Sequence, residues 1–505
     1  MLGYAHHYVL DEGALRFSAA GGESLRLSGF ESQDLAIWDV SNPSLPKEIL
    51  PSLLSTDSGY DAMMHVPEGE KRVFYAVDAS KILKPALKQD QPSSWSAQSS
   101  AGLNIIAPNS FTEQAEELAI LRRSQGYTVN VINVQDIYDE FSFGLADPEA
   151  LRRYINFLSV HTENDLIHVL LFGDASVDPR NFLGQGEFDF VPTQLVDTAF
   201  LESASDHWFV DSIPQDGAHV AIGRLTPRSS EEASTMVAKL KQRPLLFENE
   251  VALAKVLSVS AQAADYDFEN WSNMLFSNLG YDLDLQSLHI TDEDAAGLID
   301  ALQSDVDLVH YAGHGSVNMW SYHALDGEKA LALKSSGGLP LMVAVTCFNG
   351  LFHDVYSESL AESLLKAKDG GSVAVVASSA MTYPKDQLLL DESFMHEIFS
   401  AQSQSLGEAF QMAKAAASNQ DVRNTFMLFG DPSMPLRFSE ALSNPTTTSA
   451  ATAATNNAKG AGGPGYHENS GCSCSLQRAA NYSEWLGLII LAFIIRLRAL
   501  GRKRR

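Results

Sequence analysis

The chain has 505 residues, of which 45% are hydrophobic and 19% are charged, and its formal net charge is −28 at pH 7. This length exceeds what one hydrophobic core supports, so several domains are expected. The acidic charge argues against a nucleic-acid partner, because phosphate binding needs a basic surface.

Residues 1–92 have the pattern of a small β-rich domain. The strand-like runs Leu35–Val40 and Arg72–Val77 are separated by turn-forming residues such as Asn42 and Pro43. The first residues of the chain lack both a basic segment and a long apolar run, so they do not form a signal peptide. Because the other end of the chain indicates export, we expect this domain to be truncated at its N-terminus.

Strands then alternate with helices over two α/β subdomains, residues 101–248 and 249–437. The first subdomain has four expected strands: Leu103–Pro108, Tyr127–Val134, Ile167–Phe172 and His219–Arg224. The second also has four: Lys255–Ser260, the runs that stop before His314 and before Cys347, and Ser372–Ala377. Such alternation predicts right-handed crossovers and a largely parallel sheet.

Two of these strands end at reactive side chains that are closely followed by glycine. One apolar run leads to His314 and Gly315, and the other leads to Cys347. Open α/β sheets place their sites beyond the carboxyl ends of the strands, so both side chains should face one crevice. A thiol beside an imidazole is the minimal apparatus of a cysteine nucleophile. The alternatives are a buried structural cysteine and a histidine that merely follows a strand into a turn.

In the catalytic interpretation, Cys347 attacks a peptide carbonyl, while His314 helps to form the thiolate and later protonates the leaving amine. The backbone N–H groups of Gly315 and Cys347 are the candidate oxyanion donors. A rival interpretation places zinc between His314, Cys347, His323 and His353. No close paired spacing of ligands supports it, and no metal ligand is assigned.

The segments Tyr311–Ser316 and Ala344–Phe352 resemble the catalytic segments of the gingipain family of cysteine peptidases. The similarity covers roughly residues 30–437 and continues in the family's order through Ile37–Val40, Gly126–Val129, Asp139–Gly144, Leu170–Ala175, Ile222–Arg224 and Phe429–Met434. It implies a caspase-like, three-layer αβα fold with two mainly parallel-sheet subdomains. It also implies that Cys347 and His314 form the catalytic pair of an endopeptidase, which cleaves protein or peptide substrates and requires no cofactor.

The resemblance bears on four further side chains. Gln262 stands where the family has an acidic residue that orients the histidine, so it is the candidate third member. Asp265 matches an aspartate of the specificity pocket in arginine-specific members, where it would pair with a substrate Arg or Lys; the alternative is that Asp265 or Asp267 caps a helix. Asp174 and Asp206 match family acids with a structural role or a role in binding calcium as a structural ion.

The C-terminal part has a different composition. Residues 438–470 are rich in small polar residues and predict a flexible linker. Residues 471–505 carry Cys472 and Cys474, an apolar run of 11 residues and a basic end. The run is shorter than the ~20 residues of a membrane-spanning helix, but with its basic flank it predicts membrane attachment and a body outside. The alternative is an amphipathic surface helix.

This tail resembles bacterial three-part surface-sorting signals, which implies that a sorting or processing enzyme acts at Cys472 or Cys474. The alternative is a plain tail anchor with incidental cysteines. The sequence therefore predicts an exported, surface-associated cysteine endopeptidase, anchored to the membrane at least transiently and preferring Arg or Lys. The alternatives are a sortase-like transpeptidase, or a surface-binding protein with weakened catalysis, for which Gln262 is the reason.

Overall fold

The computed structural model describes residues 7–84, 89, 91–213, 218–247, 254–292, 295, 297–400 and 402–436. The chain divides into two units, residues 1–444 and 445–505. The expected linker and the sorting tail with Cys472 and Cys474 lie outside the described residues. Within the described ranges, no helix has both the length and the apolar character that a membrane span requires.

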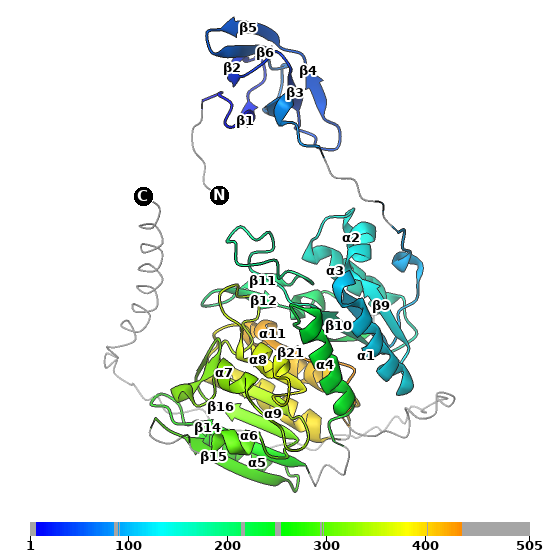
Figure 1. The fold of residues 1–505 in the computed structure, drawn as a ribbon, viewed down its shortest axis with the longest axis vertical. Helices are drawn as coiled ribbons and strands as arrows, with labels where there is room; N and C mark the ends of the chain where they lie inside the picture. Colours follow the sequence, from blue (N-terminus) through cyan, green and yellow to red (C-terminus); the bar gives the residue numbers. More distant parts are fainter. Residues whose placement is uncertain are drawn as a thin grey trace, which may run out of the picture. The chain divides into compact units, whose positions relative to one another are not determined.

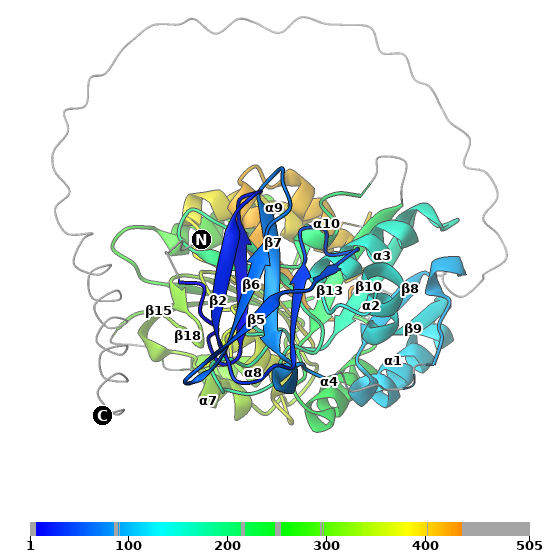
Figure 2. The same cartoon turned by 90° about the horizontal axis from the view of Figure 1, so that it is seen from above.

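The N-terminal residues form the expected small β domain, with two antiparallel sheets ordered β1-β7-β3-β4 and β2-β6-β5. Its strands are β1 (Ala14–Ala19), β2 (Ser24–Phe30), β3 (Leu35–Asp39), β4 (Lys47–Ile49), β5 (Ser52–Thr56), β6 (Gly59–His65) and β7 (Arg72–Asp78). Figure 2 shows β2, β6 and β5 side by side. The alternating strand pattern buries Leu27, Phe30 and Phe74 in a core that belongs to this domain alone.

The α/β part is built on one sheet of ten strands. In sheet order they are β15 (Asp284–Ile290), β14 (Lys255–Ala261), β16 (Leu308–Ala312), β19 (Leu341–Val345), β20 (Ala374–Ser378), β21 (Phe426–Phe429), β13 (His219–Leu225), β10 (Leu166–Phe172), β8 (Leu103–Ala107) and β9 (Val129–Asn133). Neighbouring strands are parallel within each half, and only the central pair of β20 and β21 is antiparallel. The two expected subdomains therefore share one continuous sheet.

Helices cover both faces of this sheet, which gives three layers (Figure 1). Along β8, Leu103 and Ile105 pack into one apolar cluster and Ile106 into the other. The main helices are α1 (Thr112–Ser124), α2 (Val134–Ser142), α3 (Pro148–Val160), α4 (Ser230–Gln242), α5 (Phe268–Asn278), α8 (Leu360–Lys366), α9 (Pro384–Phe399), α10 (Leu406–Ala416) and α11 (Gln420–Thr425). Asp147 caps α3 ahead of Pro148, and both are residue types that favour these positions of a helix.

Buried ion pairs explain several of the motifs that lie outside the strand ends. Asp431, directly after β21, accepts from Arg122 of α1 at 2.7 Å, and neither side chain is exposed. Asp206 receives two hydrogen bonds from Arg224, at 2.7 and 2.8 Å. Asp174 pairs with Arg228 at 2.5 Å, again away from solvent. Because buried carboxylates need such partners, these acids connect segments that are distant in the sequence.

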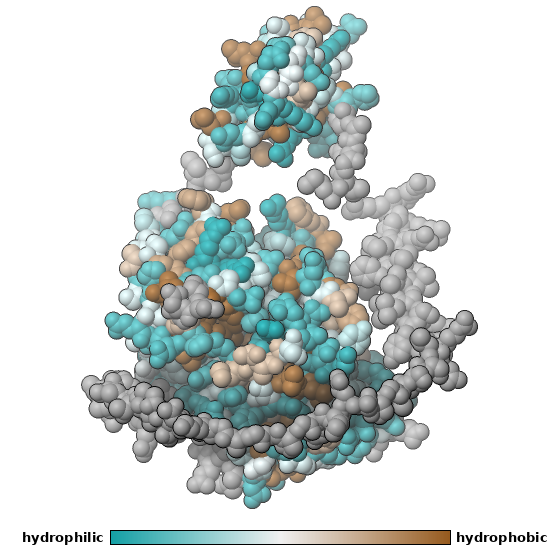
Figure 3. Space-filling view, turned by 180° about the vertical axis from the view of Figure 1, so that it is seen from behind, coloured by the Kyte–Doolittle hydropathy of each residue, from teal (hydrophilic) through white to brown (hydrophobic). Residues whose placement is uncertain are grey.

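The outer surface, unlike the apolar core, is mainly hydrophilic. On the face drawn in Figure 3, hydrophilic side chains predominate and apolar residues are scattered between them. This agrees with the formal charge of −28, which favours a well-solvated protein.

Candidate active site

The register of the sheet places the two strand ends next to each other. β16 and β19 are parallel neighbours, and Ala312 pairs with Val345. His314 and Cys347 therefore each stand two residues beyond paired positions, at the same edge of the sheet. All residues of both strands are buried, whereas His314 is exposed and Cys347 is half-buried.

His314 is held by groups from three directions. Its Nε2 atom lies 2.8 Å from Oδ1 of Asp265, and the ring meets Phe268 edge to face at 5.4 Å between centroids. The His314 carbonyl accepts from the Tyr311 hydroxyl at 2.6 Å and from the Ser321 N–H at 3.0 Å. Within the described part of the chain, Nδ1 makes no hydrogen bond. Nδ1 is therefore the ring nitrogen that can exchange a proton with another group.

The partner of His314 is Asp265, not Gln262 as the sequence leads one to expect. Gln262 is tied to the sheet, because its N–H donates to Ile290 at 2.8 Å and its carbonyl accepts from the Tyr322 hydroxyl at 2.7 Å. Among the described residues its side chain has no hydrogen bond with His314. Asp265 follows three residues later, where the loop between β14 and α5 reaches the imidazole.

The same loop lines an open polar cavity of about 450 Å3, which Asp265 borders and His314 itself does not. Gln262 and Asp265 both line it, together with Asp267, Glu269 and His289. Asp267 is the cap of α5, with its side chain accepting from the Asn270 N–H. The cavity is therefore acidic, and its acid nearest to His314 in the structure is already hydrogen-bonded to the imidazole.

Cys347 lies at a sharp turn. Its Sγ–H donates to the Thr382 carbonyl at 3.4 Å, and the next residue, Phe348, has a left-handed φ of +63°. Such a φ is uncommon for a residue with a side chain and indicates a constrained backbone. The Phe348 N–H donates to Ala380 at 3.1 Å. The segment after β20 therefore holds both the thiol and the turn that presents it. No motif in the sequence indicates this contribution.

Asn349 joins the cysteine loop to the histidine loop. Its buried Nδ2 group donates to the Ser316 carbonyl at 2.6 Å. Gly315 lies so close that an added Cβ would be 2.6 Å from Thr346 Oγ1 and 3.2 Å from Asn349 Nδ2. Gly315 is therefore required by the contact between the two loops.

Burial raises the pKa of the Cys347 thiol above its ordinary value. The thiolate is then a minor species near pH 7, and its fraction increases as the pH rises. We expect the rate of iodoacetamide alkylation at Cys347, followed by mass spectrometry of its peptide, to increase throughout the interval from about pH 7 to about pH 9. A rate that has already reached its plateau at pH 7 would instead indicate a preformed thiolate.

The described residues offer no ready-made site for either metal hypothesis. Among the described residues, no group of three or more His, Cys, Asp or Glu side chains could hold a metal ion. His353 is buried, which lowers its pKa to about 4, and His323 is exposed. Asp174 and Asp206 are occupied by Arg228 and Arg224, so these carboxylates do not fit a calcium site.

The model of peptidase family C25 matches residues 96–437. Gingipain R2 from Porphyromonas gingivalis is 25% identical over 360 residues, which are 66% of this chain and 45% of that protein. Gingipain R1 from Porphyromonas gingivalis is 27% identical over 360 residues, or 66% of this chain and 34% of that protein. The chain thus spans less than half the length of these curated relatives.

Two solved structures share the fold. The Arg-specific cysteine proteinase gingipain R has a TM-score of 0.54 and 20% identity, over 68% of this chain and 80% of that chain. The complex of pro- and mature domains of RgpB from Porphyromonas gingivalis also has a TM-score of 0.54 and 20% identity. The match covers 66% of this chain and 79% of that chain. These matches confirm the predicted caspase-like α/β fold. Since the family model covers more than half of the sequence, the chain belongs to peptidase family C25.

Proposed function

We propose that the protein is a cysteine endopeptidase with Cys347 as nucleophile and His314 as its general base and acid. The observation that carries this proposal is the hydrogen bond between Asp265 and His314 Nε2, at the strand end beside that of Cys347. It leaves Nδ1 of the imidazole for proton transfer. Family membership supports the same chemistry.

In the proposed reaction, His314 Nδ1 takes the thiol proton as Sγ of Cys347 bonds to the peptide carbonyl carbon. The N–H groups of Gly315 and Cys347 stabilise the resulting oxyanion. The imidazolium gives its proton to the leaving amine, and an acyl-enzyme remains. Water, deprotonated by His314, then attacks the thioester, which releases the carboxylate product and restores the thiol. Asp265 orients the ring and stabilises its cationic form.

We assign Asp265 as a positioning residue for His314, and one variant tests this. Asp265→Asn is expected to lower kcat about 10- to 100-fold, less than the roughly 10²–10⁴-fold of a group that transfers the proton itself, with little change in KM. Steady-state kinetics on paired substrates with Arg or norleucine before the scissile bond provide the measurement, and both substrates should lose activity equally.

The matched control is Asp267→Asn, which changes the cap of α5 but not the partner of His314. It should leave kcat within about threefold, because asparagine caps a helix about as well as aspartate and Asp267 is not the hydrogen-bond partner of His314. A selective rise in KM for the Arg substrate in Asp265→Asn, with kcat unchanged, would make Asp265 a specificity residue instead.

We further propose that the acidic cavity beside His314 favours substrates with Arg or Lys before the cleaved bond. Asp267 and Glu269 line this cavity in addition to Asp265, and carboxylates pair well with guanidinium and ammonium groups. Cleavage-site profiling with a peptide library tests this. Cleavage without enrichment of Arg or Lys would contradict the specificity but leave the peptidase proposal intact.

The alternative of weakened catalysis rests on Gln262 behind the histidine. Asp265 at 2.8 Å supplies the carboxylate that this argument lacked, so we favour the active peptidase. Single-turnover assays with an added amine acceptor separate hydrolysis from transfer. Predominant transfer product would identify a sortase-like transpeptidase.

We also propose that the protein is exported and held at the cell surface through its tail, on the sequence pattern of residues 471–505. Fractionation of cells that express the full chain, or a chain ending at residue 436, is the test. The full chain is expected in the membrane or surface fraction, and the shortened chain is expected outside that fraction. Identical distributions would contradict a role of the tail in attachment.

A further inference from the structure

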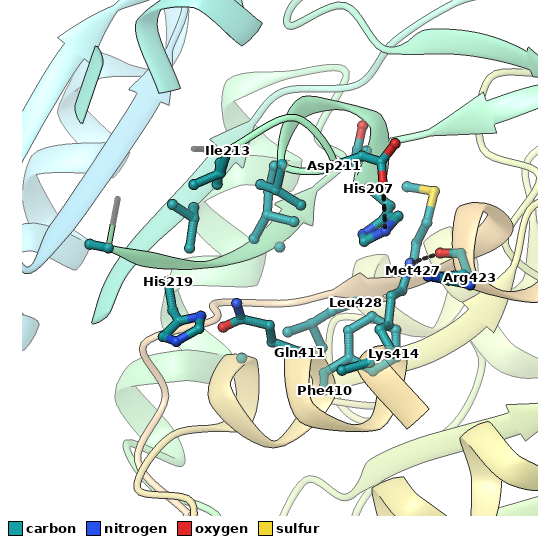
Figure 4. Close-up of a pocket in the computed structure, with 18 residues that line it drawn as sticks. His207, Asp211, Ile213, His219, Phe410, Gln411, Lys414, Arg423, Met427 and Leu428 are labelled. Carbon is teal, nitrogen blue, oxygen red and sulfur yellow. Dashed lines mark hydrogen bonds and ion pairs between the residues drawn. The ribbon is translucent and has the colours of Figure 1, made fainter. Parts of the chain in front are cut away.

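A second cavity, of about 350 Å3, lies between β13, β21 and α10. Neither His314 nor Cys347 lines it, and the proposed peptidase reaction does not use it. Much of its wall is apolar, as with Ile213, Phe410 and Leu428 (Figure 4). Its volume is at the lower end of small-molecule sites, which span about 300–1,000 Å3. The walls therefore suit a compact ligand with an apolar body.

One end of this cavity carries two cationic side chains. Figure 4 shows Lys414 and Arg423 at this end, near His207, whereas His219 and Gln411 lie at the other. Lys414 Nζ donates to the Arg423 carbonyl at 2.5 Å, and the side chain is only 6% exposed. Within the described ranges neither Lys414 nor Arg423 has a carboxylate ion-pair partner, and Arg423 Nε is buried without a hydrogen bond.

The acids nearby are already engaged or exposed. Asp206 accepts from Arg224 and from the Thr193 hydroxyl, so its charge is compensated. Asp211 is 52% exposed and lies 3.8 Å from His207 Nε2. Burial lowers the pKa of His207 to about 2, so this ring is neutral. The net charge of the side chains at this end of the cavity is therefore positive, although the chain as a whole is strongly acidic.

A buried ammonium group without a counter-charge is costly, and so is a buried N–H without an acceptor. An anion in the cavity beside Lys414 and Arg423 would compensate their charge. A phosphate would leave the apolar walls uncovered, whereas a carboxylate on a hydrocarbon body would meet the cations and the walls together. Burial lowers the pKa of Lys414 to about 7, so the amine is only partly protonated near neutral pH, and an anion bound beside it would favour the charged form.

We propose that this cavity binds a small carboxylic acid with an apolar body. The carboxylate would accept a hydrogen bond from Lys414 Nζ beside the positive charge of Arg423, and the hydrocarbon would lie along Phe410 and Leu428. Two sources offer this chemistry: a free fatty or aromatic acid, and the C-terminal carboxylate of a peptide that ends in an apolar residue.

Calorimetric titration of the full-length Cys347→Ala protein tests the proposal and prevents self-cleavage during the measurement. The probes are octanoate and N-acetyl-Ala-Ala-Phe, each paired with its neutral amide. At least one acid should bind at least tenfold more tightly than its amide, because a charge-assisted hydrogen bond depends on the anion. Binding of octanoate but not of the peptide would indicate that the ligand is a free acid. Binding of the peptide but not of octanoate would indicate that the ligand is the C-terminus of a peptide chain.

Two variants locate the binding. Lys414→Met keeps the length of the side chain without its charge and should weaken binding at least tenfold, as should Arg423→Gln. Lys368→Met changes a largely exposed lysine and should have no effect. Circular dichroism checks that each variant is folded. The proposal fails if neither acid binds at millimolar concentration, if the amides bind equally well, or if both cavity variants bind like the unchanged protein.

Discussion

Cys347→Ala is expected to reduce peptide cleavage by at least about 10³-fold, because the variant lacks the atom that bonds to the carbonyl carbon. The turn that presents the thiol depends on backbone contacts, such as the Phe348 N–H to Ala380, so the fold should persist. The measurement is hydrolysis of a fluorogenic peptide by purified protein, with the thermal unfolding midpoint as the check on folding.

Cys347→Ser is the companion variant, since it keeps a nucleophilic atom at the same position. A serine hydroxyl needs stronger activation than a thiol, so this variant should also be severely impaired. Near-normal cleavage by Cys347→Ala would show that the reaction uses another nucleophile, and the assignment of Cys347 would then be abandoned.

Arg122→Met is expected to lower the free energy of unfolding by about 3–5 kcal/mol, because it leaves the Asp431 carboxylate buried without its counter-charge. Both side chains of this pair are fully buried, and Arg122 also donates to the Pro244 carbonyl at 2.9 Å. Urea unfolding of the Cys347→Ala protein, with and without Arg122→Met, measures the difference.

The adjacent residue of the same helix is the matched control. Arg123 pairs with Glu116 at 3.1 Å, but the two side chains are 43% and 47% exposed. Exposed pairs contribute about 0–1 kcal/mol, so Arg123→Met should have a small effect. Equal destabilisation by both variants would mean that the buried pair has no special role in joining α1 to the end of β21.

The sequence is informative where burial imposes a pattern. The runs before His314 and Cys347 are apolar because β16 and β19 are covered on both faces, and the same pattern indicates that they belong to one parallel sheet. β15 has no such pattern, because it is an edge strand whose first four side chains are exposed. It is accordingly absent from the strands that the sequence predicts.

The site is predictable only in part for a similar reason. Strand ends position His314 and Cys347, whereas the contact of His314 with Asp265 depends on the path of the loop from β14 to α5. Neither the spacing nor the resemblance contains that path, and the resemblance points to Gln262 instead. The sequence also gives no indication of the contact between the thiol and the Thr382 carbonyl, or of the cavity with Lys414 and Arg423. Each of these features joins segments that are distant in the sequence.

The position of β21 has a consequence for biosynthesis. This strand is the last described one in the chain, yet it lies between β20 and β13 and is the strand through which the two halves of the sheet meet. A ribosome must therefore release residue 429 before the halves can join, although each half can begin to fold earlier. β20, which pairs with β21, also holds the cysteine loop, since Ser378 accepts from the Gly350 N–H at 2.9 Å. A nascent chain that stops short of β21 would carry both Cys347 and His314 but an unfinished support for them, so the proposed peptidase activity would have to wait until β21 is in place.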